Sequence, residues 1–269
     1  MNRKLAVIGV GNMANSIISG ITANGISVSE FYLYDKSPAA CDRYKNLDNF
    51  LITDNIHDAI KNADCILLSV KPQNYTEVLN EIKKTNNFNQ KLYISIGAGI
   101  TSQSVSEQLD GAAVVRVLPN LPMTIGMGVS VICKNDQINA DDFTFIESIF
   151  ASSGSTLLID EKDMNATIGV TSSSPAYVFK FINAICLGAK DQGLDYKQLL
   201  DTVCDMVIGS ATLLKQSADT PETLISKVAS KGGTTEQALL TLDEGDFDNI
   251  IKNAMIACTK RANELGKKQ

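Results

Sequence analysis

The stretch "KLAVIGVGNMANSIISG", Lys4–Gly20, decides the fold of the first half of this chain. Its apolar first part predicts a buried strand, and the part after the glycines predicts a helix. Between the two, Gly9, Gly11 and Ala14 form the sequence G-x-G-x-x-A. In such a turn the first glycine permits a tight bend, the second lets a pyrophosphate approach the backbone, and the alanine allows close helix packing. The stretch therefore predicts a dinucleotide-binding unit, with a glycine-rich connecting turn as the alternative.

Strand and helix patterns continue to alternate up to about residue 160. The strand patterns are short runs rich in β-branched residues, at Lys4–Val10, Phe31–Tyr34, Asp64–Val70, Leu92–Ser95, Ala113–Val117, Val129–Cys133 and Thr156–Ile159. Helical patterns separate them at Met13–Asn24, Pro38–Tyr44, Tyr75–Thr85, Ser102–Leu109 and Asp141–Ala151. Because the apolar runs are nearly continuous, we expect helices on both faces of a parallel sheet. Residues 1–160 are therefore predicted to form a Rossmann-type, doubly wound α/β domain.

The rest of the chain, residues 161–269, contains helical patterns without strand-like runs. These patterns lie at Met164–Gln192, Tyr196–Gln216, Pro221–Val228, Thr234–Leu242 and Phe247–Leu265. The first has apolar residues on several sides, which is typical of a buried helix. A small helical domain with such a helix needs further apolar surface to complete its core, so we expect an all-helical C-terminal domain that forms a homodimer. A higher oligomer stays open.

The composition argues against several classes of protein. A net charge of −6 without a basic patch argues against nucleic-acid binding. No apolar run approaches the roughly 20 residues of a membrane span, and glycines interrupt the N-terminal run that a signal peptide would need. The six cysteines are scattered without metal-ligand spacing, as in the core of a cytosolic protein. We therefore expect a cytoplasmic protein that binds neither nucleic acid nor membrane and holds no metal.

The end of the second predicted strand bears on the choice of dinucleotide. Asp35 lies roughly twenty residues beyond the glycine turn, where an acid hydrogen-bonds the ribose 2′-hydroxyl and favours NAD. Lys36 and Ser37 follow directly and suit the 2′-phosphate of NADP. The two signals conflict, so the residues alone leave NAD and NADP open.

Two further strand ends should meet the glycine turn at one edge of the sheet. Val70, Lys71 and Pro72 end one predicted strand, and Ala98 and Gly99 follow another. Cofactors lie at the carboxyl ends of the strands in this architecture, and small residues let a ligand approach the backbone. We therefore expect these residues to line the same cleft.

No set of side chains suggests an independent catalytic centre. The one histidine, His57, lies near a predicted helix start, where a surface or capping role is expected. Neither a catalytic triad nor a phosphate loop of the GKS type is present. The chemistry is then the cofactor's own, with the protein orienting and polarising the substrate. A reaction that needs little acid–base help from side chains fits this best, and hydride delivery to an already protonated, electrophilic C=N bond is one such reaction.

Five segments in one order resemble the pyrroline-5-carboxylate reductase family over essentially the whole chain. They are "GVGNMA", "SVKPQ", "VVRVLPNLPMTIGMG" (Val114–Gly128), "TIGVTSSSPAYVFKFINAI" (Thr167–Ile185) and "VASKGGTTEQALLTLDEGDF" (Val228–Phe247). The corresponding family patterns are G-x-G-x-M-A, V-K-P, V-R-x-M-P-N-T-P, G-S-G-P-A-Y and S-P-G-G-T-T. Their joint occurrence is far more specific than any one of them.

The resemblance implies reduction of 1-pyrroline-5-carboxylate to L-proline, the last step of proline biosynthesis, with NADPH slightly preferred over NADH. It also implies a Rossmann domain, a helical dimerisation domain, and a substrate site between the nicotinamide and the S-P-G-G-T-T loop. The residues it implies for substrate are Ser230, Gly233, Thr234, Thr235 and Ser173, with Thr235 as the catalytic hydroxyl near the imine nitrogen. For the cofactor it implies Gly9, Gly11, Asn12, Met13 and Ala14 in the turn, Asn55 and Lys71 near the ribose, and Asn120 and Pro122 beside the nicotinamide.

Several positions depart from the family pattern. Lys231 replaces the loop proline, and Ser172 and Ser174 replace the two glycines of G-S-G-P. Leu118 and Leu121 also differ from the usual methionine and threonine. Two alternatives therefore stay open: a dinucleotide-binding regulatory relative that has lost the reaction, and a reductase of a related cyclic imine acid.

The loop suggests how substrate is held. We expect backbone N–H groups at the start of the helix that begins at Thr234 to bind the substrate carboxylate. The hydroxyl of Thr235 would then hydrogen-bond the ring nitrogen and orient the C=N carbon for hydride transfer. The alternative is that Thr234 or Thr235 is only an N-cap, which stabilises a helix by about 1 kcal/mol. Glu236 is interpreted as a structural acid at a helix start, not as a base.

Overall fold

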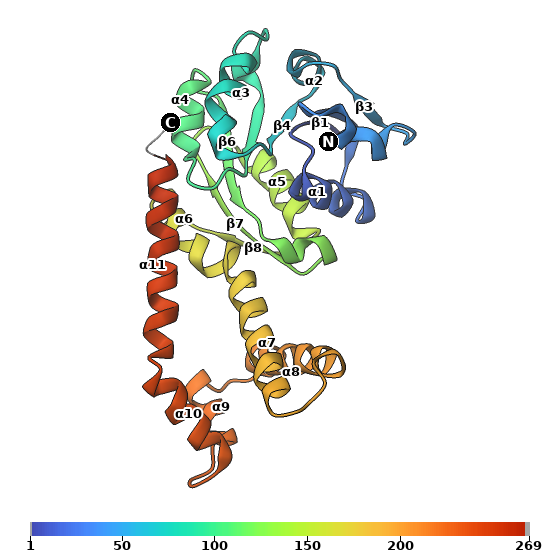
Figure 1. The fold of residues 1–269 in the computed structure, drawn as a ribbon. Helices are drawn as coiled ribbons and strands as arrows, with labels where there is room; N and C mark the ends of the chain where they lie inside the picture. Colours follow the sequence, from blue (N-terminus) through green and yellow to red (C-terminus); the bar gives the residue numbers. More distant parts are fainter. Residues whose placement is uncertain (1, 267–269) are drawn as a thin grey trace. The chain divides into compact units, whose positions relative to one another are not determined.

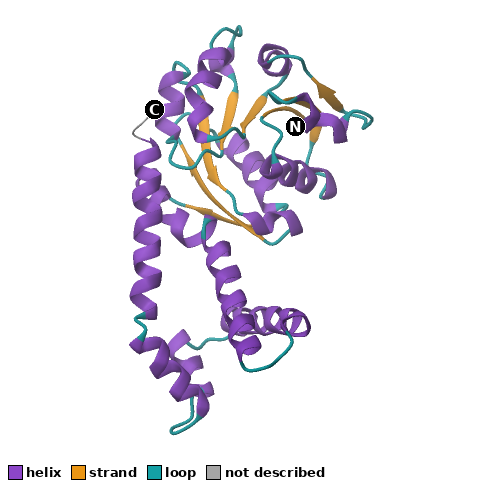
Figure 2. Cartoon of the chain, in the orientation of Figure 1, coloured by secondary structure: helices purple, strands orange, loops and turns teal. Residues whose placement is uncertain are grey.

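The computed structural model of the chain describes residues 2–266. These residues form two compact units, which Figures 1 and 2 show as ribbons. The first unit contains the chain up to Ser173 together with the segment from Met255 onward, and the second is Ser174–Ala254. The units therefore divide at other positions than residue 160, and the domain boundary expected there stays a prediction.

The first unit is built on one eight-stranded sheet in the order β3-β2-β1-β4-β5-β6-β7-β8. The strands are β1 Arg3–Ile8, β2 Val28–Tyr34, β3 Phe50–Ile52, β4 Cys65–Leu68, β5 Leu92–Ser95, β6 Ala113–Leu118, β7 Gly128–Lys134 and β8 Gly154–Leu158. Neighbouring strands are parallel except β6 and β7, which are antiparallel. The predicted doubly wound Rossmann-type sheet is confirmed, and the reversal at β7 is a difference from the fully parallel sheet that we expected.

Helices cover both faces of this sheet (Figure 2). The α-helices of the first unit are α1 Asn12–Ala23, α2 Ile56–Asn62, α3 Tyr75–Ile82, α4 Ser102–Gln108, α5 Ala140–Ala151 and α6 Glu161–Thr167. Short 3₁₀ segments lie at η1 Pro38–Tyr44, η2 Pro72–Asn74, η3 Phe88–Gln90 and η4 Leu121–Ile125, and η5, Ile168–Ser172, is a π-turn. Two expectations differ: Pro38–Tyr44 is 3₁₀, and the long helix expected over Met164–Gln192 is interrupted at η5.

The central strand β1 is buried on both faces, which explains its unbroken apolar sequence. Leu5 and Val7 belong to the core beneath α1 and α5, whereas Ala6 and Ile8 belong to the core beneath α2, α3 and α4. All four side chains are at most 1% exposed. The register of β1 is therefore fixed by apolar burial on both faces, and so is the position of the glycine turn that follows it.

The second unit is helical. It contains α7 Ser174–Asp191, α8 Tyr196–Gln216, α9 Pro221–Val228, α10 Thr234–Glu244 and the first part of α11 Phe247–Gly266, whose residues from Met255 onward belong to the first unit. Helix α7 packs on α8. Large apolar side chains such as Phe179, Ile208 and Leu213 nevertheless stay about half exposed. Within residues 2–266, no helix is both long and apolar enough to span a membrane.

An ion pair between a buried arginine and a partly exposed glutamate connects the sheet to α6 and α4. Arg116, on β6, is fully buried, and its Nη1 donates to Glu161 Oε1 at 2.5 Å. The other oxygen of Glu161 accepts the backbone N–H and the hydroxyl of Ser102, at 3.0 and 2.5 Å. Burial raises the pKa of Glu161, but the hydrogen bonds from Ser102 and the charge of Arg116 outweigh it, so this pKa lies below its usual value of 4.5. The pair thus holds the start of α4, directly after the loop that contains Ala98 and Gly99.

We predict that Glu161→Gln lowers the free energy of unfolding at pH 7 by about 3 kcal/mol, because it leaves the Arg116 charge buried without a counter-charge. The ionised Glu161 stabilises the fold above its unfolded pKa of about 4.5, and this contribution is lost as the pH falls through the lower folded pKa. When the pH is lowered from 7 to below 4.5, the free energy of unfolding should therefore fall less in the variant than in the wild type. Urea unfolding at neutral and acid pH measures both effects. Asp42→Asn, which removes an exposed pair with Lys45, should cost at most about 0.5 kcal/mol.

Candidate active site

The two glycines of the turn are needed for different structural reasons. Gly9 has φ +91°, and a Cβ there would lie 2.7 Å from the backbone oxygen of Ser69. Gly11 is the N-cap of α1 with extended backbone, and a Cβ there would meet no atom within 4 Å. Gly9 is therefore required by the fold, whereas Gly11 keeps open space in front of a helix N-terminus. This is the space that a pyrophosphate would need.

Both oxygens of the Asp35 carboxylate accept hydrogen bonds from backbone N–H groups. One oxygen accepts the N–H of Val10 in the glycine turn at 2.8 Å, and the other accepts the N–H of Ser37 at 2.8 Å. Asp35 therefore fixes the end of β2 against the turn that follows β1. The side chain of Lys36 is 87% exposed beside it and lies 3.8 Å from Glu77.

A cavity of about 550 Å³ lies at the carboxyl ends of β1, β2 and β4. It brings together many of the residues that the sequence predicted for the cofactor: Gly9, Gly11, Asp35, Lys36, Asn55, Val70 and Lys71. A second cavity of about 250 Å³ shares Val70 and Lys71 with it and adds Met13 and Ala98. Both cavities are also lined by Ser69, which we did not predict although it directly precedes the "VKP" signal. The cleft expected at this sheet edge is thus present in the first unit.

The other predicted cofactor residues do not line these two cavities: Asn12, Ala14, Ser37, Pro72, Gly99, Asn120 and Pro122. Ala14 is fully buried in the core beneath α1, the packing role that the G-x-G-x-x-A pattern assigns to it. Gly99 has φ +81°, and a Cβ there would lie 2.5 Å from the backbone oxygen of Ala262 in α11. Close packing on α11 therefore accounts for this glycine without a ligand.

Two of the polar residues predicted for the cofactor form hydrogen bonds to backbone groups with their side chains. Asn120 is buried; its Oδ1 accepts the N–H of Val129 at 2.8 Å, and its Nδ2 donates to the oxygen of Thr171 at 3.0 Å. Asn55 caps α2 by accepting the N–H of Asp58 at 2.9 Å. Asn120 thereby joins the loop before η4 to β7 and to η5, so it shapes the wall of the smaller cavity.

Of the predicted substrate residues, Ser173 closes the first unit and the other four lie in the second. The Ser173 hydroxyl lies 3.2 Å from the Cys258 thiol of α11. In the second unit Gly233 is the N-cap of α10, in extended conformation and without a side-chain cap. Thr234 and Thr235 are the first two helical residues, so the alternative that one of them is the N-cap is wrong. The first amides of α10 have no acceptor within the helix.

His57 lies on α2 and is bonded at both ring nitrogens. Nδ1 lies 2.9 Å from the hydroxyl of Thr85, and Nε2 lies 2.7 Å from a carboxylate oxygen of Glu81. This partly exposed cluster is consistent with the surface role that we expected. Within residues 2–266, no group of three or more potential metal-binding side chains lies together.

Two family models match the chain. The model described as pyrroline-5-carboxylate reductase dimerisation matches residues 161–265. The model described as NADP oxidoreductase, coenzyme F420-dependent, matches residues 4–99. The first match spans the helical part of the chain, and the second spans the glycine turn and the ends of β2 and β4 that line the larger cavity.

Relatives match over nearly the full length. Pyrroline-5-carboxylate reductases of Corynebacterium melassecola and Haemophilus influenzae are each 32% identical, with 98% of both chains covered, and that of Escherichia coli is 30% identical over 99% of this chain and all of its own. Among solved structures, pyrroline carboxylate reductase of Plasmodium falciparum with NADP bound has a TM-score of 0.89 at 28% identity, with 98% of each chain covered. The Streptococcus pyogenes 1-pyrroline-5-carboxylate reductase has a TM-score of 0.89 at 26% identity, covering 97% of this chain and 98% of its own.

We predict that replacements of the two turn glycines separate folding from cofactor binding. Gly11→Ala should leave the melting temperature unchanged, because its Cβ meets no atom, yet weaken NADPH binding on the order of tenfold by filling the space before α1. Gly9→Ala should instead lower the stability by about 2 kcal/mol or more, through left-handed backbone and collision with Ser69. Thermal unfolding and a fluorescence titration with NADPH measure the two effects.

Gly25→Ala is the matched control for backbone strain, since Gly25 has φ +63° with open space around it. It should cost about 1 kcal/mol and leave NADPH affinity unchanged. Equal NADPH affinity of wild type and Gly11→Ala would contradict the role of Gly11.

Proposed function

The chain belongs to the pyrroline-5-carboxylate reductase family, and on that premise we propose that it reduces 1-pyrroline-5-carboxylate to L-proline, the last step of proline biosynthesis, with a reduced nicotinamide cofactor. The observation that carries this proposal is the cavity at the glycine turn, at the carboxyl ends of the strands. The chain that forms this cavity is similar to these reductases over nearly its full length. The proposed location is the cytoplasm.

The first unit fits an NADP or NAD cofactor. The open space in front of Gly11 suits the pyrophosphate, and the cavity that runs from Asp35 and Lys36 to Val70 and Lys71 suits the rest of the dinucleotide. Bound there, the nicotinamide supplies the hydride. NADPH is the preferred form in this proposal, because both oxygens of the Asp35 carboxylate accept backbone N–H groups, while the exposed Lys36 can exchange its long contact with Glu77 for a 2′-phosphate.

The second unit supplies the substrate contacts in this proposal. The substrate carboxylate accepts hydrogen bonds from the amides at the start of α10, where the helix dipole favours an anion. The Thr235 hydroxyl bonds the ring nitrogen and fixes the C=N carbon for attack. Ser173, a residue of the first unit, contributes a further hydroxyl in this proposal. These groups orient and polarise the substrate and need no histidine.

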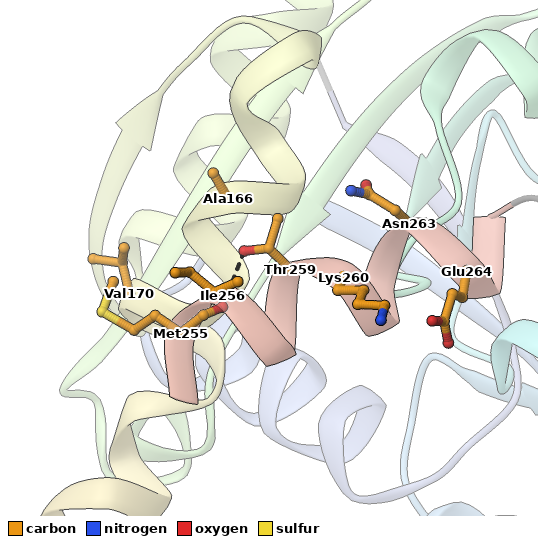
Figure 3. A pocket seen from close by; sticks show the side chains of 8 residues that line it. All are labelled: Ala166, Val170, Met255, Ile256, Thr259, Lys260, Asn263 and Glu264. Atoms are coloured by element: carbon orange, nitrogen blue, oxygen red, sulfur yellow. Dashed lines mark hydrogen bonds between the residues drawn. The ribbon is translucent and has the colours of Figure 1, made fainter. Parts of the chain in front are cut away.

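We also propose that the chain is a homodimer, with a higher oligomer as an open alternative. A groove of about 770 Å³ in the first unit runs between Ala166 and Val170 on one side and α11 on the other (Figure 3). Val170 is 53% and Ile256 65% exposed. Both lie within the part of the chain that matches the dimerisation model, and exposed apolar patches on soluble proteins commonly mark interfaces.

The reaction is tested by following oxidation of NADPH and of NADH with 1-pyrroline-5-carboxylate, beside its six-membered homologue. We predict turnover with the five-membered imine and a lower KM for NADPH. Turnover only with the homologue would favour the related imine-acid reductase, and binding of NADPH without turnover of either would favour the regulatory relative.

We predict that Thr235→Val lowers kcat about 100-fold, because the isosteric methyl cannot bond the ring nitrogen in the transition state. Since Gly233 is the N-cap, the melting temperature should change little. Thr235→Ser, which keeps the hydroxyl, should retain most of the activity. A Thr235→Val enzyme with normal kcat would remove the catalytic role.

Light scattering should give the mass of a dimer for the wild-type chain. We predict that Val170→Asp combined with Ile256→Asp shifts the mass toward that of a monomer, because both changes place charge in the proposed interface. Leu47→Asp, at an equally exposed leucine between η1 and β3, should leave the dimer intact. A monomeric wild type at micromolar concentration would overturn the proposal.

A further inference from the structure

The substrate loop before α10 is a tight turn of defined type. The N–H of Gly233 donates to the oxygen of Ser230 at 3.0 Å, which closes a four-residue turn over Lys231 and Gly232. Gly232 has φ +74°, and Lys231 is not among the residues with positive φ. A turn with positive φ only at its third residue is type II. This geometry favours glycine at position 232.

The second residue of a type II turn is the one at which proline is favoured. The family pattern S-P-G-G places proline there, and this chain has Lys231. Proline fixes φ near the value that the turn needs and reduces the freedom of the unfolded chain. Lysine does neither, so another interaction must hold the turn if the loop is to be equally ordered.

Glu236 makes such an interaction. Its Oε2 accepts the N–H of Gly232 at 2.7 Å, from one turn into α10. That N–H belongs to the central peptide of the turn, the peptide whose flip interconverts types II and I. A flip would break this charge-assisted bond and point the oxygen of Lys231 at the carboxylate. Glu236 therefore holds this peptide in the orientation that the type II turn needs.

We propose that Glu236 is the positioning residue of the substrate loop in this chain and takes over the ordering role of the absent proline. This inference rests on the proposed function, in which the amides after Gly233 and the Thr235 hydroxyl hold the substrate. Glu236 does not touch the reacting atoms. It holds the turn that fixes where those amides and that hydroxyl lie.

An acid that served only the helix dipole would act differently. Such an acid stabilises α10 regardless of what occupies position 231. A residue that replaces the proline must instead become dispensable when the proline is restored. Coupling between positions 231 and 236 is therefore the property that separates the two roles.

The experiment is a double-mutant cycle of Glu236→Ala and Lys231→Pro, with KM and kcat measured for 1-pyrroline-5-carboxylate and KM for NADPH. Glu236→Ala should raise the KM for the imine about tenfold and leave the KM for NADPH unchanged. Lys231→Pro should restore most of this loss in the double variant. Glu236→Gln, whose amide oxygen can accept the same N–H, should lie between wild type and Glu236→Ala. Glu244→Ala, at the far end of α10, is the matched control and should change none of these constants.

An unchanged KM in Glu236→Ala, or a loss that Lys231→Pro leaves in place, would overturn the proposal. Amide hydrogen exchange of Gly232 gives a readout that needs no substrate. Exchange should be several-fold faster in Glu236→Ala than in wild type, and close to wild type in Glu236→Gln. If the wild-type chain does not reduce the imine but the Gly232 amide is protected, the proposed function fails and the hydrogen bond stands. Equal exchange in wild type and Glu236→Ala removes the positioning role itself.

Discussion

Burial of β1 on both faces of the sheet is the constraint on which the rest of the molecule depends. Because its side chains are held in two cores at once, β1 cannot shift along β2 or β4 without exposing apolar surface. The ends of these three strands therefore meet at one place, where Asp35 bonds the turn after Gly9 and Ser69 approaches it. The cavity at this edge is a consequence of strand order and burial.

The two helix starts proposed to bind ligands, one in each unit, share one feature. Helices α1 and α10 both begin at a glycine N-cap in extended conformation, Gly11 and Gly233, without a side-chain cap. In the described part of the chain, five other helices have a side-chain cap, whose oxygen accepts a backbone N–H of the first turn. These caps are Asn55, Thr101, Asn139, Asp195 and Thr220. A side-chain cap satisfies amides that a ligand would otherwise bind. Each of these two helices follows a turn in which a second glycine has positive φ, Gly9 and Gly232.

The predictable parts of the fold are those in which local pattern and burial agree. The strands of the sheet and the glycine turn follow from continuous apolar runs, whereas β3, with three residues, is too short to give a pattern. The helix α2 was not predicted, although α4, which was predicted, has the same length. Within η5, a Cβ on Gly169 would lie 3.2 Å from the Met255 Cα, so glycine at this position allows a close contact between segments far apart in sequence. The bonds of Glu161, Asn120 and Glu236 are equally invisible in the sequence, because a polar residue does not reveal its partner.

The last segment of α11 completes the first unit although the second unit separates it from the rest of the first unit in the sequence. Ala262 belongs to the core cluster of Leu118, Val131 and Met164, and Asn263 bonds Asn165 at 2.7 Å. During translation, the N-terminal sheet must therefore wait for the intervening helical unit before its last face is covered. Domains generally fold in order as they leave the ribosome. In this chain the first unit needs residues that follow the second unit in the sequence, so its core is completed only after the second unit has been synthesised.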